Sequence, residues 1–271
     1  DKNSNPSFQR ASVKVVILCG GKGTRLREET EFRPKPMVKI GGKPILWHIM
    51  KTYSHFGFNE FVLCLGYQGN VIKEYFYHYM LHNSDVTVKL GKDQHVTMHN
   101  SSIEENWTIT MVDTGEKHLK GARVKKVERY IDGDSFMVTY GDGIGNVNIK
   151  DLINFHQSNG KIATVTGVSP PSAFGQIHAQ DSRVIEFNEK PQIKEGIING
   201  GFLVFNRKIF DYLTEDETCD LEMGALEQLT SEEQLMVFRH EGGWACMDTY
   251  RDTVHLNQLW EKNQAFWKVW H

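Results

Sequence analysis

The chain has 271 residues, of which 39% are hydrophobic, and its formal net charge is −3. This charge argues against nucleic-acid binding, which usually shows a strong basic excess, and the apolar runs are too short for a membrane span. We expect a globular chain with a sizeable core, formed as one domain over residues 14–271 after a polar, disordered tail over residues 1–13.

Apolar runs and amphipathic patterns alternate along the chain, as strands and helices do. The predicted strands cover residues 13–20, 60–66, 135–143 and 161–168, the third with its closing loop. The predicted helices cover residues 44–57, 70–81 and 149–160. This alternation predicts a mainly parallel sheet with crossover helices, which is an α/β fold.

A polar stretch interrupts this alternation. Residues 86–90 and 107–113 form short alternating runs, which predict the strands of a β-hairpin. We therefore assign a hairpin insertion to about residues 83–120. The last stretch, about residues 251–271, is predicted to be helical.

The first predicted strand runs directly into a glycine-rich loop. Gly20, Gly21 and Gly23 follow the apolar run, and Arg25 comes two residues later. Glycines let main-chain N–H groups approach a ligand closely, as a concave cradle of donors suited to phosphate oxygens. An arginine adds a planar and permanently charged fork. The loop therefore predicts a polyphosphate site.

Lys35 supplies a second cation ten residues further on. It lies between Pro34 and Pro36, so its backbone is stiff and its side chain is held in place. Two common glycine motifs are absent: no Walker A spacing occurs, and Leu26 occupies the third glycine position of the dinucleotide fingerprint. A GG-x-G seen alone would be equally typical of an ordinary strand-to-helix turn.

Three loops of this composition follow predicted parallel strands. They are residues 20–25, 66–69 and 140–143. Because ligands in open parallel sheets collect beyond the carboxyl ends of the strands, we expect these loops to meet at one edge. Asp142, in the third loop, is an exposed carboxylate between two glycines, which fits either a turn or a Mg²⁺ ligand beside phosphates.

GG-x-GTRL followed by PKP resembles the signature of the sugar-phosphate nucleotidyltransferases. The resemblance runs from about residue 14 to the end and is strongest to the glucose-1-phosphate cytidylyltransferase branch. The similar blocks are residues 33–67, VDTG at 112–115, YGDG at 140–143, INGGF at 198–202, MDT at 247–249 and LWEKNQAFWKVW at 259–270.

The resemblance implies a Rossmann-like, mixed and mainly parallel sheet flanked by helices, which is the nucleotidyltransferase fold. It also implies a Mg²⁺-dependent reaction between CTP and a sugar 1-phosphate, with α-D-glucose 1-phosphate expected. The products are a CDP-sugar for surface-polysaccharide sugar biosynthesis and pyrophosphate. Another sugar phosphate or nucleotide (UTP or dTTP) stays open, as does a non-catalytic sugar-nucleotide-binding homologue.

The resemblance assigns roles residue by residue. Arg25 and Lys35 are catalytic, and the nucleotide-binding set is Leu18, Gly20, Gly21, Gly23, Thr24, Arg25, Lys35, Gly121 and Arg123. The sugar-phosphate-binding set is Gly175, Glu189, Lys190, Asn199 and Gly200. Asp142 and Asp248 are the two Mg²⁺ ligands. Without the resemblance, Glu189 and Lys190 before Pro191 would equally fit an exposed strand-end pair.

The remaining features concern assembly, location and the sugar. The four cysteines show no C-x-x-C pair, which indicates a reduced, cytoplasmic protein. The resemblance implies a homo-oligomer, as a trimer or hexamer. Residues 219–229 depart from the W/F-E-x-x-P-L form expected there, because Leu221 and Ala225 replace the aromatic and the proline while Glu222 is kept.

Overall fold

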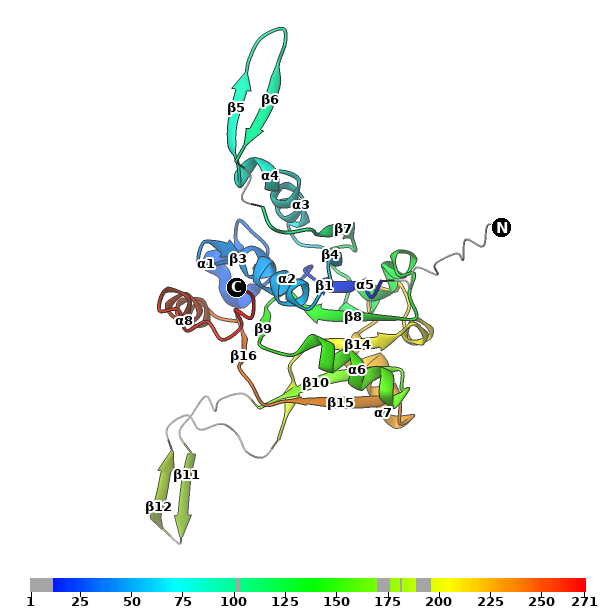
Figure 1. The fold of residues 1–271 in the computed structure, drawn as a ribbon. Helices are drawn as coiled ribbons and strands as arrows, with labels where there is room; N and C mark the ends of the chain where they lie inside the picture. Colours follow the sequence, from blue (N-terminus) through cyan, green and yellow to red (C-terminus); the bar gives the residue numbers. More distant parts are fainter. Residues whose placement is uncertain (1–11, 101–102, 170–175, 181, 189–195) are drawn as a thin grey trace, which may run out of the picture.

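An eight-stranded mixed sheet forms the centre of the computed structural model, which describes residues 12–100, 103–169, 176–180, 182–188 and 196–271 (Figure 1). Its strand order is β13-β10-β14-β8-β1-β4-β7, and β15 pairs with β10. The bounds are β13 Ile198–Asn199, β10 Ala163–Val168, β14 Leu203–Asn206, β8 Ser135–Tyr140, β1 Val15–Leu18, β4 Glu60–Leu65, β7 Thr108–Asp113 and β15 Leu235–His240.

The sheet is parallel on one side of β8 and mixed on the other. β8, β1, β4 and β7 are parallel to one another. β14 is antiparallel to β8, β10 is antiparallel to β14, and β15 is parallel to β10. This arrangement confirms the predicted mixed, mainly parallel α/β sheet.

Helices cover both faces of the sheet. A central parallel strand such as β1 is therefore buried on both sides and must be apolar on both. Val15 and Ile17 belong to one core cluster, whereas Val16 and Leu18 belong to the other. The helices are α1 Arg27–Thr30, α2 Ile45–His55, α3 Gly69–Tyr77, α4 Tyr79–His82, α5 Lys120–Lys126, α6 Ile149–Asn159, α7 Glu227–Ser231 and α8 Tyr250–Glu261. No helix among the described residues is long and apolar enough to cross a bilayer.

Several short elements complete the fold. The 3-10 helices are η1 Thr24–Leu26, η2 Lys35–Met37, η3 Glu128–Tyr130 and η4 Arg207–Tyr212, and η5 Leu221–Leu226 is a π-helix. The strands outside the main sheet pair as β2 Lys39–Ile40 with β3 Lys43–Pro44, β5 Asp85–Lys89 with β6 His95–His99, β9 Gly143–Gly145 with β16 Trp244–Cys246, and β11 Gln176–Gln180 with β12 Arg183–Asn188.

The sequence located the longer helices α2, α3, α6 and α8, and it missed the short helices α1, α5 and α7. α2 and α6 occupy the predicted ranges, and each is followed by a glycine with positive φ, Gly57 (+90°) and Gly160 (+66°). The predicted helix over 70–81 is interrupted at His78, where α3 ends and α4 begins. The predicted C-terminal helix ends at Glu261, and the chain then turns back so that Trp267 is fully buried.

The predicted insertion is only partly a hairpin. β5 and β6 form a hairpin that projects from the body of the molecule (Figure 1). The prediction that residues 107–113 form a hairpin strand is wrong, because β7 joins the main sheet parallel to β4 with Val112 buried. Alternation marks a half-buried strand but does not reveal its partner, so the sequence misassigned this one.

Candidate active site

A cavity of about 900 Å³ opens at the carboxyl ends of β1 and β8. The residues that line it are Leu18 to Arg25, Lys35, Pro36, Glu116 to Lys120, Arg123, Tyr140 to Asp142, Asn199, Glu222, Cys246 and Asp248. The loops after β1 and β8 therefore meet as the sequence predicts. Loop 66–69 lies behind the wall, where the Tyr67 N–H donates to the Gly20 carbonyl at 3.3 Å.

The glycine loop needs its glycines for two different reasons. Gly23 has φ +59°, which disfavours other residues, and its carbonyl accepts hydrogen bonds from the Leu26 N–H (3.0 Å) and the Thr30 hydroxyl (2.9 Å). At Gly20 a Cβ atom would lie 1.9 Å from Nη1 of Arg123. Gly21, by contrast, faces open space.

Arg123 supports the glycine loop from behind. Its Nη2 donates to the Gly20 carbonyl at 3.1 Å, its Nη1 to Oγ1 of Thr114 at 2.9 Å, and its Nε to the His118 carbonyl at 2.9 Å. Only 4% of the residue is exposed, and this burial lowers the pKa of the guanidinium. Arg123 thus reaches the cavity wall with its donors committed to the protein.

Gly121, also predicted to bind nucleotide, lies outside the cavity lining. A Cβ atom there would lie 2.8 Å from the carbonyl oxygen of Cys219, and the neighbouring Asp220 backbone is equally close. The glycine permits α5 to pack directly against the chain that leads into η5. Its structural effect is therefore on the position of that segment.

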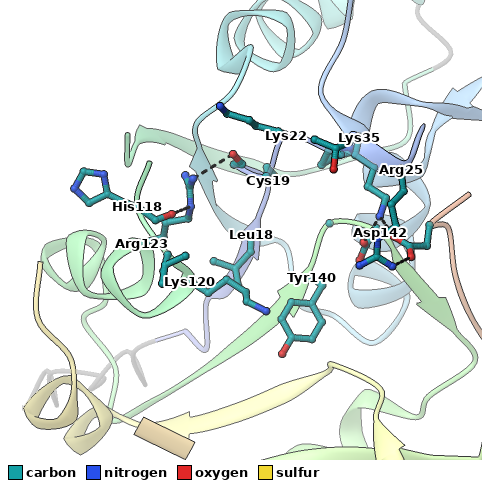
Figure 2. A pocket seen from close by; sticks show the side chains of 18 of the residues that line it. Leu18, Cys19, Lys22, Arg25, Lys35, His118, Lys120, Arg123, Tyr140 and Asp142 are labelled. Atoms are coloured by element: carbon teal, nitrogen blue, oxygen red, sulfur yellow. Dashed lines mark hydrogen bonds and ion pairs between the residues drawn. The ribbon is translucent and has the colours of Figure 1, made fainter. Parts of the chain in front are cut away.

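Two cations and two carboxylates converge on one side of the cavity (Figure 2). Lys35 Nζ lies 2.8 Å from Oδ2 of Asp142 and 2.8 Å from Oδ1 of Asp248. Arg25 contacts the other oxygen of Asp248. Residues separated by more than 200 positions thus share one charged centre.

Short backbone pairings hold this centre in place. β9 and β16 are antiparallel, and the Met247 N–H donates to the Asp142 carbonyl at 2.8 Å. The Asp248 N–H donates to Oδ2 of Asp252 at 3.0 Å, at a capping box that begins α8. Lys35 opens η2 directly after Pro34, as its two flanking prolines suggested.

The charges in this centre shift one another's pKa values. Burial disfavours the charged Lys35 ammonium, but Asp142 and Asp248 outweigh this effect and raise its pKa. Burial likewise opposes ionisation of Asp248, but Lys35 and Arg25 lower the pKa of that carboxyl overall. Cys246, which lines the same wall, has a pKa raised to about 12 by burial and by Asp142, so its thiol stays protonated at neutral pH.

A second polar group of residues lines the cavity apart from these charges, and Figure 2 shows Lys120 and Tyr140 there. The Tyr140 hydroxyl donates to Oε1 of Glu222 at 2.7 Å and accepts from Nδ2 of Asn199 at 3.0 Å. Lys120 Nζ pairs with the same Oε1 and lies 5.0 Å from the Tyr140 ring centroid. Sequence reasoning found only Asn199 of this group.

The signals for the missed residues were weak. Tyr140 directly precedes the GDG loop, and Glu222 is the residue kept in a segment that otherwise departs from its expected form. Lys120 and His118 carry no pattern of their own. Oε2 of Glu222 and Nδ1 of His118, two buried atoms of residues in this lining, have no hydrogen-bond partner among the described residues.

The sugar-phosphate set is only partly described. Gly175, Glu189 and Lys190 lie outside the described residues. Asn199 lines the cavity. Gly200 lies behind it, where its carbonyl accepts a hydrogen bond from Nε1 of Trp244 at 2.9 Å.

Comparisons with known proteins place these features in context. Residues 14–268 match the family model described as nucleotidyl transferase. The chain is 48% identical over 259 residues to glucose-1-phosphate cytidylyltransferase of Salmonella typhi. This alignment covers 95% of this chain and all of that protein. It is 29% identical over 260 residues to mannose-1-phosphate guanylyltransferase catalytic subunit beta of Dictyostelium discoideum, over 92% of this chain and 66% of that protein.

The fold also matches that of a solved structure. A UDP-glucose pyrophosphorylase complexed with UDP-glucose superposes with a TM-score of 0.65 at 16% identity, over 93% of this chain and 99% of that one. At this identity the match supports the fold alone.

Proposed function

The chain belongs to the nucleotidyl transferase family, and we propose that it transfers a cytidylyl group from CTP to a sugar 1-phosphate. α-D-Glucose 1-phosphate is the proposed sugar substrate, because the Salmonella typhi relative that carries this name is 48% identical over its whole length. The product is a CDP-sugar, with surface-polysaccharide sugar biosynthesis as the proposed use. The observation that carries the proposal is the meeting of the glycine loop with Arg25, Lys35, Asp142 and Asp248 in one cavity.

The reaction joins two polyanions. A phosphate oxygen of the sugar 1-phosphate attacks the α-phosphorus of CTP, and the bond to the β-phosphate oxygen breaks to release pyrophosphate. Main-chain N–H groups of the glycine loop and Arg25 hold the triphosphate, and Lys35 neutralises charge near the reacting phosphorus. Positioning and charge stabilisation suffice, so no covalent enzyme intermediate is needed.

Asp142 and Asp248 are the proposed Mg²⁺ ligands. The two carboxylates suit this role because one oxygen of each lies 2.8 Å from the same Lys35 Nζ, so both converge on a single cation. Among the described residues no group of three or more His, Cys, Asp or Glu side chains forms a metal site. Mg²⁺ commonly takes only one or two carboxylates and completes its shell with water and substrate phosphates, whose charge it neutralises.

The sugar phosphate is proposed to contact residues from several loops. By family resemblance, Lys190 holds its phosphate, Glu189 its ring hydroxyls, and Gly175 allows close backbone approach. Asn199 lines the cavity and supports this proposal directly. A non-catalytic homologue is disfavoured, because the charged residues that the chemistry needs are retained and lie together.

Pyrophosphate release from CTP and glucose 1-phosphate, with and without Mg²⁺, tests the proposed function. We expect turnover that requires the metal, and UTP accepted with a penalty of about 1–3 kcal/mol because it differs from CTP only at the base edge. Equal efficiency with a purine triphosphate would contradict the assignment of CTP.

A homo-oligomer, as a trimer or hexamer, is also proposed. The projecting hairpin exposes apolar side chains on both of its strands, including Val88 (51%), Val96 (50%) and Met98 (43%), and such a surface favours association with another chain. Light scattering at micromolar concentration tests this, and a monomeric mass would refute it. The four cysteines are free, which supports a cytoplasmic location.

A further inference from the structure

The backbone of Asp248 lies between a strand pair and a helix, and it is held from both sides. On the strand side, the N–H of the preceding residue, Met247, donates to the Asp142 carbonyl at 2.8 Å. On the helix side, the Asp248 N–H donates to Oδ2 of Asp252 at 3.0 Å. The first bond joins the segments of the two proposed metal ligands to each other, and the second joins Asp248 to α8.

Asp252 gathers the start of α8 around one carboxylate oxygen. Besides the Asp248 N–H, its Oδ2 accepts hydrogen bonds from the N–H (2.7 Å) and the hydroxyl (2.9 Å) of Thr249. The Thr249 hydroxyl oxygen also accepts from the Asp252 N–H at 3.3 Å, which completes the capping box. A capping box needs only the bonds between these two residues. The bond to Asp248 is additional, and it reaches the residue whose side chain contacts Lys35 and Arg25.

The helix that carries Asp252 is itself anchored near Lys35. Oδ1 of Asn257, in the middle of α8, accepts from the Gly41 N–H at 2.9 Å, and its Nδ2 donates to the Lys39 carbonyl at 3.2 Å. These contacts join α8 to the turn that follows the segment of Lys35. Asp252 therefore holds Asp248 from a helix that is fixed relative to the rest of the charged centre.

We infer that Asp252 is a positioning residue for the metal, because it holds the backbone of Asp248 and so aims that carboxylate at the same point as Asp142. The inference rests on the proposed function. Asp252 is absent from the lining of the cavity, whereas Asp142 and Asp248 belong to it. It therefore acts through Asp248 rather than on the substrate.

Electron paramagnetic resonance titration with Mn²⁺, without nucleotide, tests the inference in the wild type and in Asp252→Ala. Loss of a group that orients a metal ligand typically costs about 10- to 100-fold in metal affinity. We expect a loss of about tenfold in Asp252→Ala. The Mg²⁺ concentration for half-maximal pyrophosphate release should rise by the same factor. Excess Mg²⁺ should restore most of kcat, because both metal ligands are kept.

The conservative variant Asp252→Asn separates geometry from charge. Its amide oxygen is still an acceptor for the N–H groups of Asp248 and Thr249, although the negative charge is lost. Asp252→Asn should therefore recover most of the Mn²⁺ affinity that Asp252→Ala loses. Equal losses in the two variants would assign the effect to the charge of Asp252, and this result would overturn positioning through the backbone.

The start of α6 offers a matched control for the loss of a helix cap. Oδ1 of Asn148 accepts from the N–H groups of Lys150 (3.1 Å) and Asp151 (3.2 Å), and no residue of α6 lines the cavity. Asn148→Ala and Asp252→Ala should each lower Tm by about 2–4 °C. Only Asp252→Ala should weaken Mn²⁺ binding.

Wild-type Mn²⁺ affinity in Asp252→Ala would leave Asp252 with a purely structural role and would overturn the inference. Should Asp252→Ala lose its thermal transition, Asp252→Ser carries the same comparison, because its shorter side chain withdraws the acceptor from the Asp248 N–H. Mn²⁺ that binds the wild type no better than Asp142→Asn would also overturn the inference.

The metal titration and the turnover assay distinguish failure of this inference from failure of the proposed function. Mn²⁺ binding that depends on Asp252, without pyrophosphate release from CTP and glucose 1-phosphate in the wild type, would refute the transfer reaction and keep the positioning role. Turnover by the wild type, with equal Mn²⁺ affinity in the wild type and Asp252→Ala, would do the reverse.

Discussion

The two ends of the cavity are built in different ways. At the phosphate end, most of the wall comes from the continuous segment 18–25 and from Lys35 with its neighbouring proline. At the other end, Lys120, Tyr140, Asn199 and Glu222 come from α5, β8, β13 and η5, which are far apart in the sequence. The glycine loop and Lys35 at the first end follow from local backbone stiffness and glycine conformation, although Asp142 and Asp248 join them only in the folded chain. The second end is assembled entirely from distant segments.

In the proposed function, the two ends serve two kinds of chemistry. A triphosphate presents the same charges in every nucleotide, so a compact motif of N–H donors and cations suffices to bind it. Sugars differ in single hydroxyl groups, and discriminating among them needs acceptors placed from several directions. We therefore expect substitutions at the phosphate end to change rate, and substitutions at the sugar end to change selectivity.

Replacing Lys35 should have the largest effect. Lys35→Ala removes a preorganised cation next to the reacting phosphates, and loss of one such contact typically costs about 10²–10³ in rate. Pyrophosphate release under saturating CTP and sugar phosphate measures the loss in kcat. Lys39→Ala, which removes an exposed cation outside this cavity, is the matched control. Wild-type turnover in folded Lys35→Ala would exclude this lysine from the mechanism.

Two buried histidines, His48 and His156, are neutral at pH 7. His48 Nε2 bonds the carbonyl of Ile40, just after the segment that carries Lys35, and His156 Nδ1 bonds Oγ1 of Thr164 in β10, which pairs with the strand carrying Asn199. Burial lowers the pKa of both imidazoles to about 4.

These histidines make stability fall in acid. Between pH 6.5 and 4 the unfolded chain binds a proton that the folded chain refuses, so stability is complete above pH 6.5 and decreases as the pH falls. The loss at pH 5 is about 2 kcal/mol for His48. Thermal unfolding against pH should be flatter in His48→Gln and His156→Gln, and unchanged slopes would contradict the neutral state.

The next prediction concerns metal binding in the absence of nucleotide. Lys35→Ala should strengthen this binding, although the same substitution reduces turnover. The Lys35 ammonium occupies both carboxylates of the proposed metal pair. Removing one partner of a charge pair leaves the other uncompensated, so Lys35→Ala should bind Mn²⁺ more tightly, by about tenfold or 1.4 kcal/mol. Asp142→Asn should bind it more weakly. Electron paramagnetic resonance titration measures both, with Lys39→Ala as control.

The smallest predicted effect lies at the sugar end. Tyr140→Phe deletes one neutral hydroxyl that bonds Glu222, which is worth about 1 kcal/mol or fivefold. The KM of the sugar phosphate should rise by that factor while kcat with saturating substrates stays near the wild-type value. A fall in kcat as large as that of Lys35→Ala would erase the distinction between the two ends.

The sequence predicted a large part of the fold for a simple reason. Periods of two and about 3.6 residues mark strands and helices locally, and Gly57 and Gly160 mark where helices end. The hairpin assignment at residues 107–113 failed because strand pairing is not local, and β7 lies beside β4 across a separation of some 48 residues in register. The predicted loop 66–69 likewise reached the site only from behind.

For the site, Gly20 to Arg25 and Lys35 were predictable from the sequence by itself, because glycine conformation and flanking prolines act within a few residues. Asp142 was readable as a carboxylate at a strand end, and Asp248 only through family resemblance. The tertiary structure alone decided that Arg123 turns its donors inward to the Gly20 carbonyl, and that the Tyr140 hydroxyl donates to Glu222. Both depend on which atoms the folded sheet brings within hydrogen-bond distance, and no local pattern encodes that.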